Sequence, residues 1–242
     1  MPMQASQTAV VTGASSGIGA AIAICLAKEG ANLHLIGRHS AALQSVAQQA
    51  KPDSPSVFTY LADFERDEDL EKLKEELARN CRNGVDILVH SAGTISTGPM
   101  ATAPLADFDR QHRVNVRAPY ALTQSLLPLL RKQRGAVVFI NSSVGLTTRA
   151  NISQYSATKH ALKAMADSLR AEVNADGLRV LSVYPGRTAS PQQAAIHQVE
   201  GKTYSPERLL QPGDIARIVV DALKLDRTAE VTDINIRPLQ KT

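Results

Sequence analysis

Apolar, β-branched runs alternate with amphipathic helical patterns from one end of this 242-residue chain to the other. Candidate strands cover residues 9–11, 32–36, 56–61, 86–90, 136–141, 179–184 and 232–236. Candidate helices lie between them, near residues 17–29, 40–49, 67–81, 104–131, 153–175 and 212–224. Such alternation predicts an α/β fold in which a parallel sheet carries helices on both faces.

No linker or low-complexity tract divides the chain, and α/β domains of about 200 residues or more are common. We therefore expect one domain over residues 1–242, a doubly wound Rossmann fold with seven parallel strands. Right-handed crossovers and a switch of direction at the first strand favour the strand order 3-2-1-4-5-6-7. Ligand sites are expected at the carboxyl ends of strands one, four, five and six.

A glycine-rich turn follows the first strand directly. The run Thr12-Gly13-Ala14-Ser15-Ser16-Gly17-Ile18-Gly19 leads from this strand into an apolar helix. Gly13 permits a tight turn, Gly17 lets the backbone approach a pyrophosphate, and Gly19 lets the helix pack close to the sheet. The helix N-terminus adds free N–H groups and the positive end of its dipole. The segment therefore predicts a dinucleotide site, although its spacing differs from the general Gly-x-Gly-x-x-Gly fingerprint.

Tyr155 and Lys159 stand four residues apart in a predicted helix. This spacing places both side chains on one helix face, about 5–6 Å apart at Cβ. A lysine ammonium at this distance is expected to lower the pKa of the phenol from its ordinary value near ~10. The tyrosine can then exchange a proton with an alkoxide, which is the acid–base half of a carbonyl/alcohol redox reaction.

Together these segments resemble the short-chain dehydrogenase/reductase family, and the resemblance covers essentially the whole chain. Further landmarks occur in the family's order: Asp63, His90-Ser91-Ala92-Gly93, Asn115, Ser142 and Pro185-Gly186. The resemblance implies a soluble oxidoreductase that transfers a hydride between a nicotinamide and a carbonyl or secondary alcohol. The sequence leaves open which substrate this is and which direction dominates.

The resemblance also assigns the catalytic groups. Tyr155 is the general acid in reduction and the general base in oxidation, and Lys159 additionally binds the nicotinamide ribose hydroxyls. Ser142, thirteen residues before Tyr155, hydrogen-bonds the substrate oxygen, with Ser143 in the same turn as the competing candidate. Asn115 holds a water that links Lys159 to solvent; asparagine is a poor choice inside a helix, which suggests a task for it.

The residues after the second strand indicate the cofactor. Gly37 stands where an enzyme that prefers NAD(H) usually places an acidic residue, and Arg38 follows. A guanidinium can bind a phosphate through two hydrogen bonds, so Arg38, with Ser15 and His39, predicts a preference for NADP(H) over NAD(H). The alternative is a solvent-facing arginine in a turn.

Other cofactor contacts are implied by the family pattern, with departures from it. Ala92 and Gly93 are expected to provide backbone contacts, whereas His90 and Ser91 replace the family's two asparagines. Asp63 matches a residue near the adenine amino group, with a helix N-cap as the alternative. Thr188 lies closer to Pro185-Gly186 than the family's usual threonine. The complete expected set is Gly13, Ser15, Ser16, Gly17, Ile18, Gly19, Arg38, His39, Asp63, Ala92, Gly93, Tyr155, Lys159, Pro185, Gly186 and Thr188.

Composition narrows the remaining function classes. The net charge of +4 is dispersed, and without tryptophan or an interleaved aromatic stripe the chain gives little support for nucleic-acid binding. The two cysteines and six histidines show no ligand-type spacing, so no metal is predicted. No apolar run approaches the ~18 residues of a membrane span, and we expect a cytoplasmic protein with no membrane partner.

The segment 187–211 contains two prolines, Pro191 and Pro206, is followed directly by Pro212, and has no clear strand, so we expect it to be a substrate lid. The predicted protein is therefore an NADP(H)-dependent carbonyl reductase or alcohol dehydrogenase with a small-molecule substrate. Its alternative is a non-catalytic dinucleotide-binding regulator. The resemblance further implies a homotetramer or homodimer, assembled through the two long helices that contain Asn115 and Tyr155.

Overall fold

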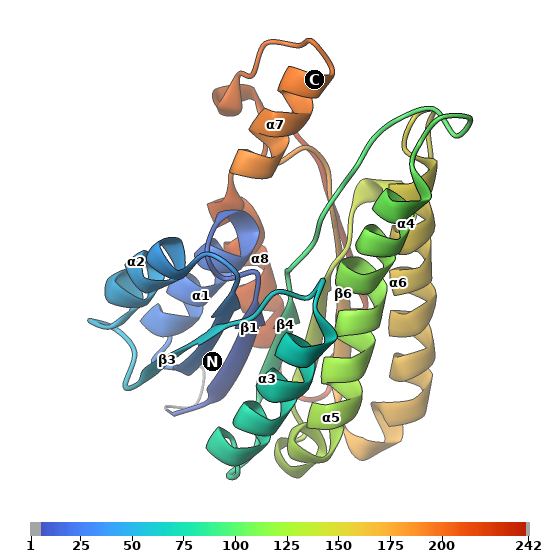
Figure 1. Cartoon of the computed structure of the whole chain (residues 1–242). Coiled ribbons are helices and arrows are strands. Elements are labelled where there is room, and N and C mark those ends of the chain that lie inside the picture. Colours follow the sequence, from blue (N-terminus) through green and yellow to red (C-terminus); the bar gives the residue numbers. More distant parts are fainter. Residues whose placement is uncertain (1–5, 241–242) are drawn as a thin grey trace.

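Seven parallel strands form a single sheet at the centre of the molecule, in the order β3-β2-β1-β4-β5-β6-β7 (Figure 1). The computed structural model describes residues 6–240 of the chain. The strands are β1 (Thr8–Thr12), β2 (Asn32–Gly37), β3 (Val57–Leu61), β4 (Ile87–His90), β5 (Ala136–Ile140), β6 (Arg179–Pro185) and β7 (Asp233–Ile236). The predicted fold class and strand order are therefore confirmed.

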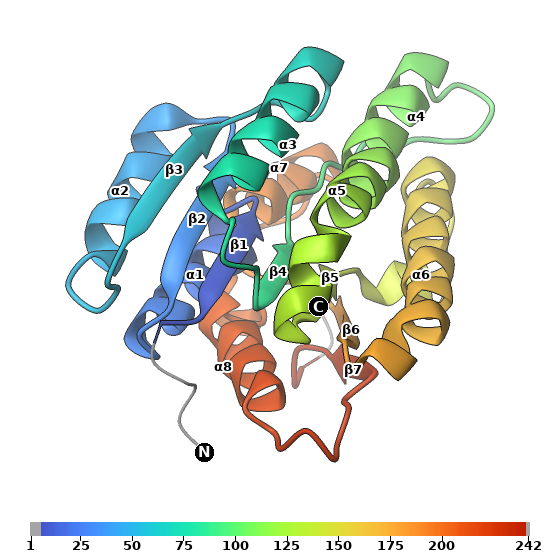
Figure 2. The same ribbon diagram turned by 90° about the horizontal axis from the view of Figure 1, so that it is seen from below.

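Helices cover both faces of this sheet (Figure 2). One layer contains α1 (Gly17–Lys28), α2 (Ser40–Ala50) and α8 (Pro212–Leu223), and the other contains α3 (Asp67–Asn80), α5 (Ala118–Gln133) and α6 (Ser153–Val173). Each layer buries an apolar cluster against the sheet, around Leu26, Leu33 and Val219 on one face and around Leu77, Leu122 and Val137 on the other. The central strands are buried on both sides, which explains why they read as continuous apolar runs and not as alternating ones.

The helix expected over residues 104–131 is interrupted. It consists of α4 (Leu105–His112), a five-residue π-helical turn η1 (Arg113–Arg117) and α5. Pro119 follows this turn and has no N–H to give to the carbonyl of Asn115, which removes one regular helical hydrogen bond. The wider turn places Asn115 at the point where the helix passes the cavity described below, and single π turns often occur at functional sites.

Sequence patterns did not predict helix α7 (Pro191–Val199), which lies in the segment expected to be a lid. Its N-cap Ser190 accepts a hydrogen bond from the Gln193 N–H at 3.1 Å, and Pro191 occupies the first helical position. Both are known helix-start signals, but the helix is short and has no regular apolar stripe. In Figure 1, α7 stands apart from both helical layers. Short turns complete the chain: η2 (Ser143–Gly145), η3 (Asn174–Asp176) and η4 (Pro206–Arg208).

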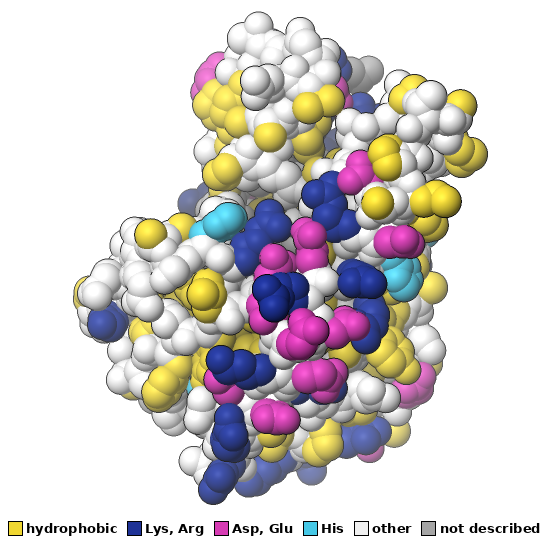
Figure 3. Space-filling model, in the orientation of Figure 1, with side chains coloured by type: hydrophobic (Ala, Val, Ile, Leu, Met, Phe, Trp, Pro, Cys, Tyr) yellow, Lys and Arg dark blue, Asp and Glu magenta, His cyan; other side chains and the backbone are white. Residues whose placement is uncertain are grey.

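The surface carries charges of both signs. Figure 3 shows Lys and Arg side chains interspersed with Asp and Glu where α3 lies. Ion pairs on this helix include Lys74–Glu71, 2.7 Å apart, and Lys72–Glu76, 4.0 Å apart. This part of the surface therefore lacks the one-signed field that a polyanion would require. Within residues 6–240, no helix has the length and apolar character needed to cross a bilayer.

Candidate active site

A cavity of about 970 Å³ opens where β1, β4, β5 and β6 end. Its lining comes from the turn that follows each of these strands, including Gly13, Ala92, Ser142 and Gly186. The volume is at the upper end of the ~300–1,000 Å³ range of ligand pockets. Most of the predicted site residues line it: Gly13, Ser15, Ser16, Gly17, Ile18, Arg38, His39, Asp63, Ala92, Gly93, Ser142, Tyr155, Lys159, Pro185, Gly186 and Thr188.

The glycine turn fits closely against its neighbours. Gly13 has φ +65°, and a Cβ atom there would lie 2.7 Å from the Ala92 nitrogen. A Cβ atom on Gly19 would lie 2.3 Å from the Gly13 carbonyl oxygen, so only glycine allows the helix to start this close to the turn. The Thr12 hydroxyl accepts hydrogen bonds from the Ser91 and Ala92 N–H groups, at 3.1 and 3.2 Å, and joins the ends of β1 and β4.

Backbone N–H groups at the start of α1 lie beside the cavity. Helix α1 begins at Gly17, and the side chain of its N-cap Ser16 makes no capping hydrogen bond. The first N–H groups of α1 are therefore available to an anion, which the helix dipole also favours. A diphosphate group suits this position, as the sequence predicts.

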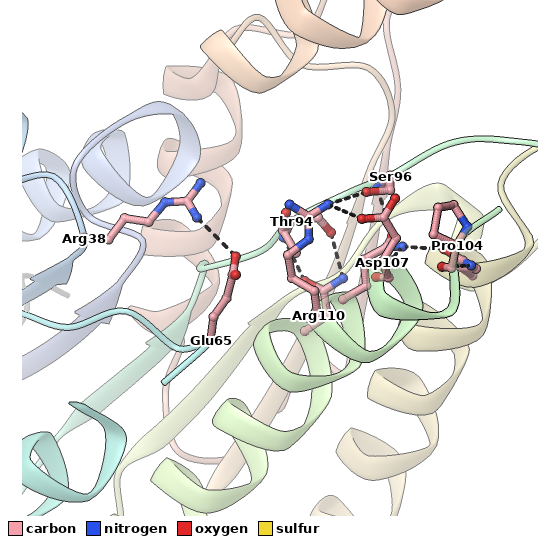
Figure 4. Close-up of polar contacts among 10 residues, drawn as sticks. Arg38, Glu65, Thr94, Ser96, Pro104, Asp107 and Arg110 are labelled. Carbon is pink, nitrogen blue, oxygen red and sulfur yellow. Dashed lines mark hydrogen bonds and ion pairs between the residues drawn. The ribbon is translucent and has the colours of Figure 1, made fainter. Parts of the chain in front are cut away.

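Arg38 and Asp63 line the cavity on the side of the glycine turn, where Gly37 lies against Ser15. The Arg38 side chain is 51% exposed, and its Nη1 atom lies 3.6 Å from Glu65 Oε1 (Figure 4). The guanidinium thus points toward the cavity rim with most of its donors free. Asp63 is not a helix N-cap, because α3 is capped at Arg66; its Oδ1 atom instead accepts a hydrogen bond from the Glu65 N–H at 3.1 Å.

Tyr155 and Lys159 meet at the inner end, on the first turns of α6. The Lys159 ammonium lies 5.7 Å from the centroid of the Tyr155 ring and donates to the Ile140 carbonyl oxygen at 3.0 Å. Ser142 and Ser143 both line the cavity there. Only Ser142 has its hydroxyl beside that of Tyr155, where its hydrogen bond opposes the effect of burial on the Tyr155 pKa.

The pKa of Tyr155 does not follow the expected direction. Burial raises it to about 12, the Ser142 hydroxyl opposes this rise, and no effect of Lys159 is resolved. Burial also lowers the pKa of Lys159 from 10.5 to about 8, which weakens the very charge that was expected to act on the phenol. A tyrosine with this raised pKa is protonated at neutral pH and can serve as a proton donor.

Asn115 ties the loop after β4 to helix α6. Its amide donates to the Thr94 carbonyl oxygen at 2.9 Å and to Thr158 Oγ1 at 3.0 Å, and its oxygen accepts from the Thr94 N–H at 2.8 Å. These bonds use both donors of the amide, so the side chain holds protein groups and leaves only a lone pair of Oδ1 for water. Gly93 adjoins this point: a Cβ atom there would lie 3.5 Å from Asn115 Oδ1.

A second polar network holds the same loop farther from the sheet (Figure 4). Arg110 donates to Ser96 Oγ at 2.6 Å and to Asp107 Oδ1 at 2.9 Å. Gln111, fully buried, accepts from the Ser96 N–H at 3.1 Å and donates to Gln154 on α6. The loop is thus fixed to both α4 and α6.

Asn141 is a site residue that sequence reasoning missed. It is 4% exposed, accepts from the Ser142 N–H at 2.9 Å and donates to the Lys159 carbonyl oxygen at 3.1 Å. One side chain therefore fixes the main chain at both the serine and the lysine. A sequence signal exists: Asn141 is a polar residue directly after a wholly apolar run, and the predicted strand 136–141 included it as its last residue.

Of the three residues that depart from the family pattern, Ser91 and Thr188 line the cavity and His90 does not. His90 faces away from the cavity: it is 2% exposed, lies 2.8 Å from Thr123 Oγ1 through Nε2, and stacks on Phe139. Burial lowers its pKa to about 3, so it stays neutral. Ser91 lines the cavity. Thr188 also lines it, but its hydroxyl donates to the Gly186 carbonyl oxygen at 3.1 Å.

Comparison with known proteins agrees with this geometry. The family model described as short chain dehydrogenase matches residues 7–201. An uncharacterised oxidoreductase of Staphylococcus aureus (strain USA300) is 32% identical over 240 residues, covering 99% of this chain and 100% of that protein. An uncharacterised short-chain type dehydrogenase/reductase of Sinorhizobium fredii (strain NBRC 101917 / NGR234) is also 32% identical, covering 98% of this chain and 93% of that protein.

Two solved structures share the architecture over nearly their whole length. The alcohol dehydrogenase of the archaeon Thermococcus sibiricus, complexed with 5-hydroxy-NADP, superposes with a TM-score of 0.87 at 26% identity and covers 98% of each chain. A metagenomic short-chain oxidoreductase in complex with NADP has a TM-score of 0.83 at 27% identity, covering 98% of this chain and 99% of that one. The similarity therefore includes the strand ends that build the cavity.

Proposed function

Because the chain belongs to the short-chain dehydrogenase family, we propose that it is an NADP(H)-dependent carbonyl reductase or alcohol dehydrogenase. In this proposal, a hydride passes between the nicotinamide and a carbonyl carbon or secondary alcohol. One observation supports this proposal above all: Tyr155, Lys159 and Ser142 line the same cavity as the glycine turn.

The residues present fit a dinucleotide. The uncapped N-terminus of α1 would hold the diphosphate, and the close packing at Gly13 and Gly19 keeps the backbone clear for it. Arg38 would bind the 2′-phosphate of NADP(H), since its guanidinium is half exposed and position 37, where NAD(H)-preferring enzymes place an acid, is a glycine. Two of the structurally similar proteins were solved with NADP or 5-hydroxy-NADP, which supports the same cofactor here.

The inner end of the cavity would perform the proton transfer. The bound cofactor supplies or accepts the hydride. Ser142 donates a hydrogen bond to the substrate oxygen, and Tyr155 passes its proton to that oxygen as negative charge develops on it. A phenol that is protonated at neutral pH is in the form that reduction uses; oxidation requires the tyrosine to lose its proton first.

Lys159 and Asn115 would support this step. The Lys159 ammonium lines the cavity and has donors left beyond its bond to Ile140, and these would bind the nicotinamide ribose hydroxyls. Asn115 positions the loop and helix that flank the lysine, and its remaining lone pair is available to a water of the proton relay. Residues 187–211, which include α7, would act as the lid, because 187–196 supply much of the cavity wall.

Assembly into a homodimer or homotetramer is part of the same proposal. Tyr120 on α5 is 56% exposed and Leu105 on α4 is 77% exposed, so apolar side chains are available on the helical segment that contains Asn115. Light scattering coupled to size-exclusion chromatography would measure the mass in solution; a monomer at micromolar concentration would contradict the assembly.

The function is tested by a panel of ketones, aldehydes and hydroxy acids assayed with NADPH, NADH and their oxidised forms. We expect turnover of at least one carbonyl class, with a higher kcat/KM for NADPH than for NADH. Absence of NADPH binding in a fluorescence titration would contradict the proposal, whichever substrates are used.

A further inference from the structure

The charged residues at the substrate end of the cavity are all basic. Lys159, Arg149 and Arg187 line this end, together with apolar side chains such as Ile95, Ile152 and Ile196. Among the described residues that line the cavity, the only carboxylate is that of Asp63, at the adenosine end. At this end the lining therefore presents cations to the substrate and no carboxylate of its own.

Two of these three cations already have tasks. Lys159 serves the cofactor and the tyrosine in the proposed reaction. Arg187 is 15% exposed and donates to both oxygens of Glu200, at 2.9 and 2.7 Å. This ion pair, in which Arg187 Nη2 bonds both carboxylate oxygens, joins the segment after β6 to the end of α7, so Arg187 fixes the position of α7.

Arg149 is held far less tightly. It lies in the loop between η2 and α6, its side chain is 51% exposed, and its Nη2 atom is 3.4 Å from Glu200 Oε1. That oxygen already accepts from Arg187 Nη2, and Lys202 lies 2.9 Å from the other oxygen. Three cations thus surround one carboxylate, and the cluster keeps a net positive charge even with Glu200 ionised, as its pKa of about 2 requires.

We infer that the substrate carries a carboxylate and that Arg149 binds it. This inference rests on the proposed function and names the substrate class of that site: an oxo acid in reduction and the corresponding hydroxy acid in oxidation. One accessible guanidinium matches a single carboxylate in charge and in planar, two-pronged geometry. Apolar side chains that line the same cavity, such as Ile152, would contact the carbon chain that separates the acid from the carbonyl.

The reaction balances for this class. The hydride of NADPH forms a bond to the carbonyl carbon, the π electrons of C=O move to oxygen, and that oxygen takes the Tyr155 proton, giving a hydroxy acid and NADP⁺. The carboxylate takes no part in bond making. The substrate carboxylate would replace Glu200 as the partner of Arg149, which would place the substrate against the lid.

The test compares acids with their neutral esters. With NADPH, wild-type protein should reduce levulinate and acetoacetate with a kcat/KM roughly tenfold to a hundredfold above that of methyl levulinate and methyl acetoacetate. Arg149→Gln should remove this preference, mainly through the KM of the acid, while kcat/KM for the esters and the KM for NADPH stay within about twofold. Arg149→Lys should retain part of the preference, because it keeps the charge and loses the fork.

Lys202→Gln is the matched control. It removes the same charge from the same carboxylate cluster, but Lys202 does not line this cavity. Its acid preference should remain; an equal loss in both variants would mean that the net field and not Arg149 is responsible, which would overturn the inference. A wild-type preference for the esters, or an equal loss of acid and ester turnover in Arg149→Gln, would also overturn it and leave the oxidoreductase function intact.

A binding measurement covers the case in which these ketones turn over slowly. Calorimetric titration of the NADP⁺ complex with hexanoate and with hexanamide should show tighter binding of the acid, lost in Arg149→Gln. Equal affinities for the two probes would overturn the inference, whereas loss of all turnover with intact NADPH binding would count against the proposed function alone.

Discussion

Replacing Lys159 by methionine should make the stability of the fold less dependent on pH. The ammonium is 4% exposed, and burial lowers its pKa from 10.5 to about 8. Between these two values, the unfolded chain binds more protons than the folded one. The stability of the wild-type protein should therefore rise with pH through this window, because the folded state no longer has to bury a charge.

The magnitude follows from the same two values. The gap between 10.5 and about 8 corresponds to about 3 kcal/mol of unfolding free energy. The folded protein is less stable by this amount below the folded-state pKa, and the loss disappears above the pKa of the unfolded chain. Between pH 7 and pH 9.5 the recovery amounts to about 2 kcal/mol. Loss of the hydrogen bond to the Ile140 carbonyl costs the variant about 1–3 kcal/mol, but this cost is the same at every pH.

Urea unfolding followed by circular dichroism, without cofactor, measures the effect at several pH values from 7 to 9.5. The difference in unfolding free energy between wild type and Lys159→Met should shift by about 2 kcal/mol in favour of wild type as the pH rises. Lys72→Met removes a lysine whose side chain is 75% exposed, and its difference from wild type should stay nearly flat. A flat difference for Lys159→Met as well, or one of opposite sign, would refute the reasoning from burial.

Three further predictions concern the cofactor end and the scaffold of the site. Arg38→Asp should shift the ratio of kcat/KM for NADPH over NADH toward NADH by at least about tenfold, whereas Arg66→Asp nearby should not; steady-state kinetics with an unchanged ratio would contradict the assignment. In urea unfolding, Gly13→Ala should lower the unfolding free energy by about 3 kcal/mol, and it should also weaken NADPH binding. The control Gly30→Ala, whose added Cβ atom would meet no neighbour, should lower the unfolding free energy by about 1–2 kcal/mol and leave NADPH binding unchanged. Equal effects of the two substitutions would contradict the close-packing argument. Asn141→Ala should lower stability by about 1–3 kcal/mol and reduce kcat more than it raises KM, and kinetics that change only KM would argue against its positioning role.

Local patterns were sufficient to predict the architecture. Buried parallel strands give apolar runs, and the first five are each followed by a segment with a helical pattern, so the sequence predicts the order of elements. The glycine turn was predictable for a steric reason: Gly13 and Gly19 occupy points where any side chain would overlap backbone atoms. Such constraints act within a few residues along the chain or between strand ends whose adjacency the fold dictates.

The parts that were missed depend on contacts between distant segments. Asn141 acquires its role from the carbonyl of Lys159, eighteen residues away, and the cluster around Glu200 joins three separate segments. The π-helical turn at Asn115 and the helix α7 lie in segments without a clean period. The predicted downward shift of the Tyr155 pKa was wrong, because helical spacing gives the distance to Lys159 but not the burial of the two groups, which dominates both pKa values.

The measurement that tests the account most directly is NADPH binding and carbonyl turnover measured side by side for wild type and Tyr155→Phe. Removal of one hydroxyl should leave the dissociation constant for NADPH within about twofold and lower kcat by about 10²–10⁴, the usual contribution of a general acid. A variant that turns over at near wild-type rates would show that the proton comes from elsewhere, and the mechanism built on Tyr155 would have to be abandoned.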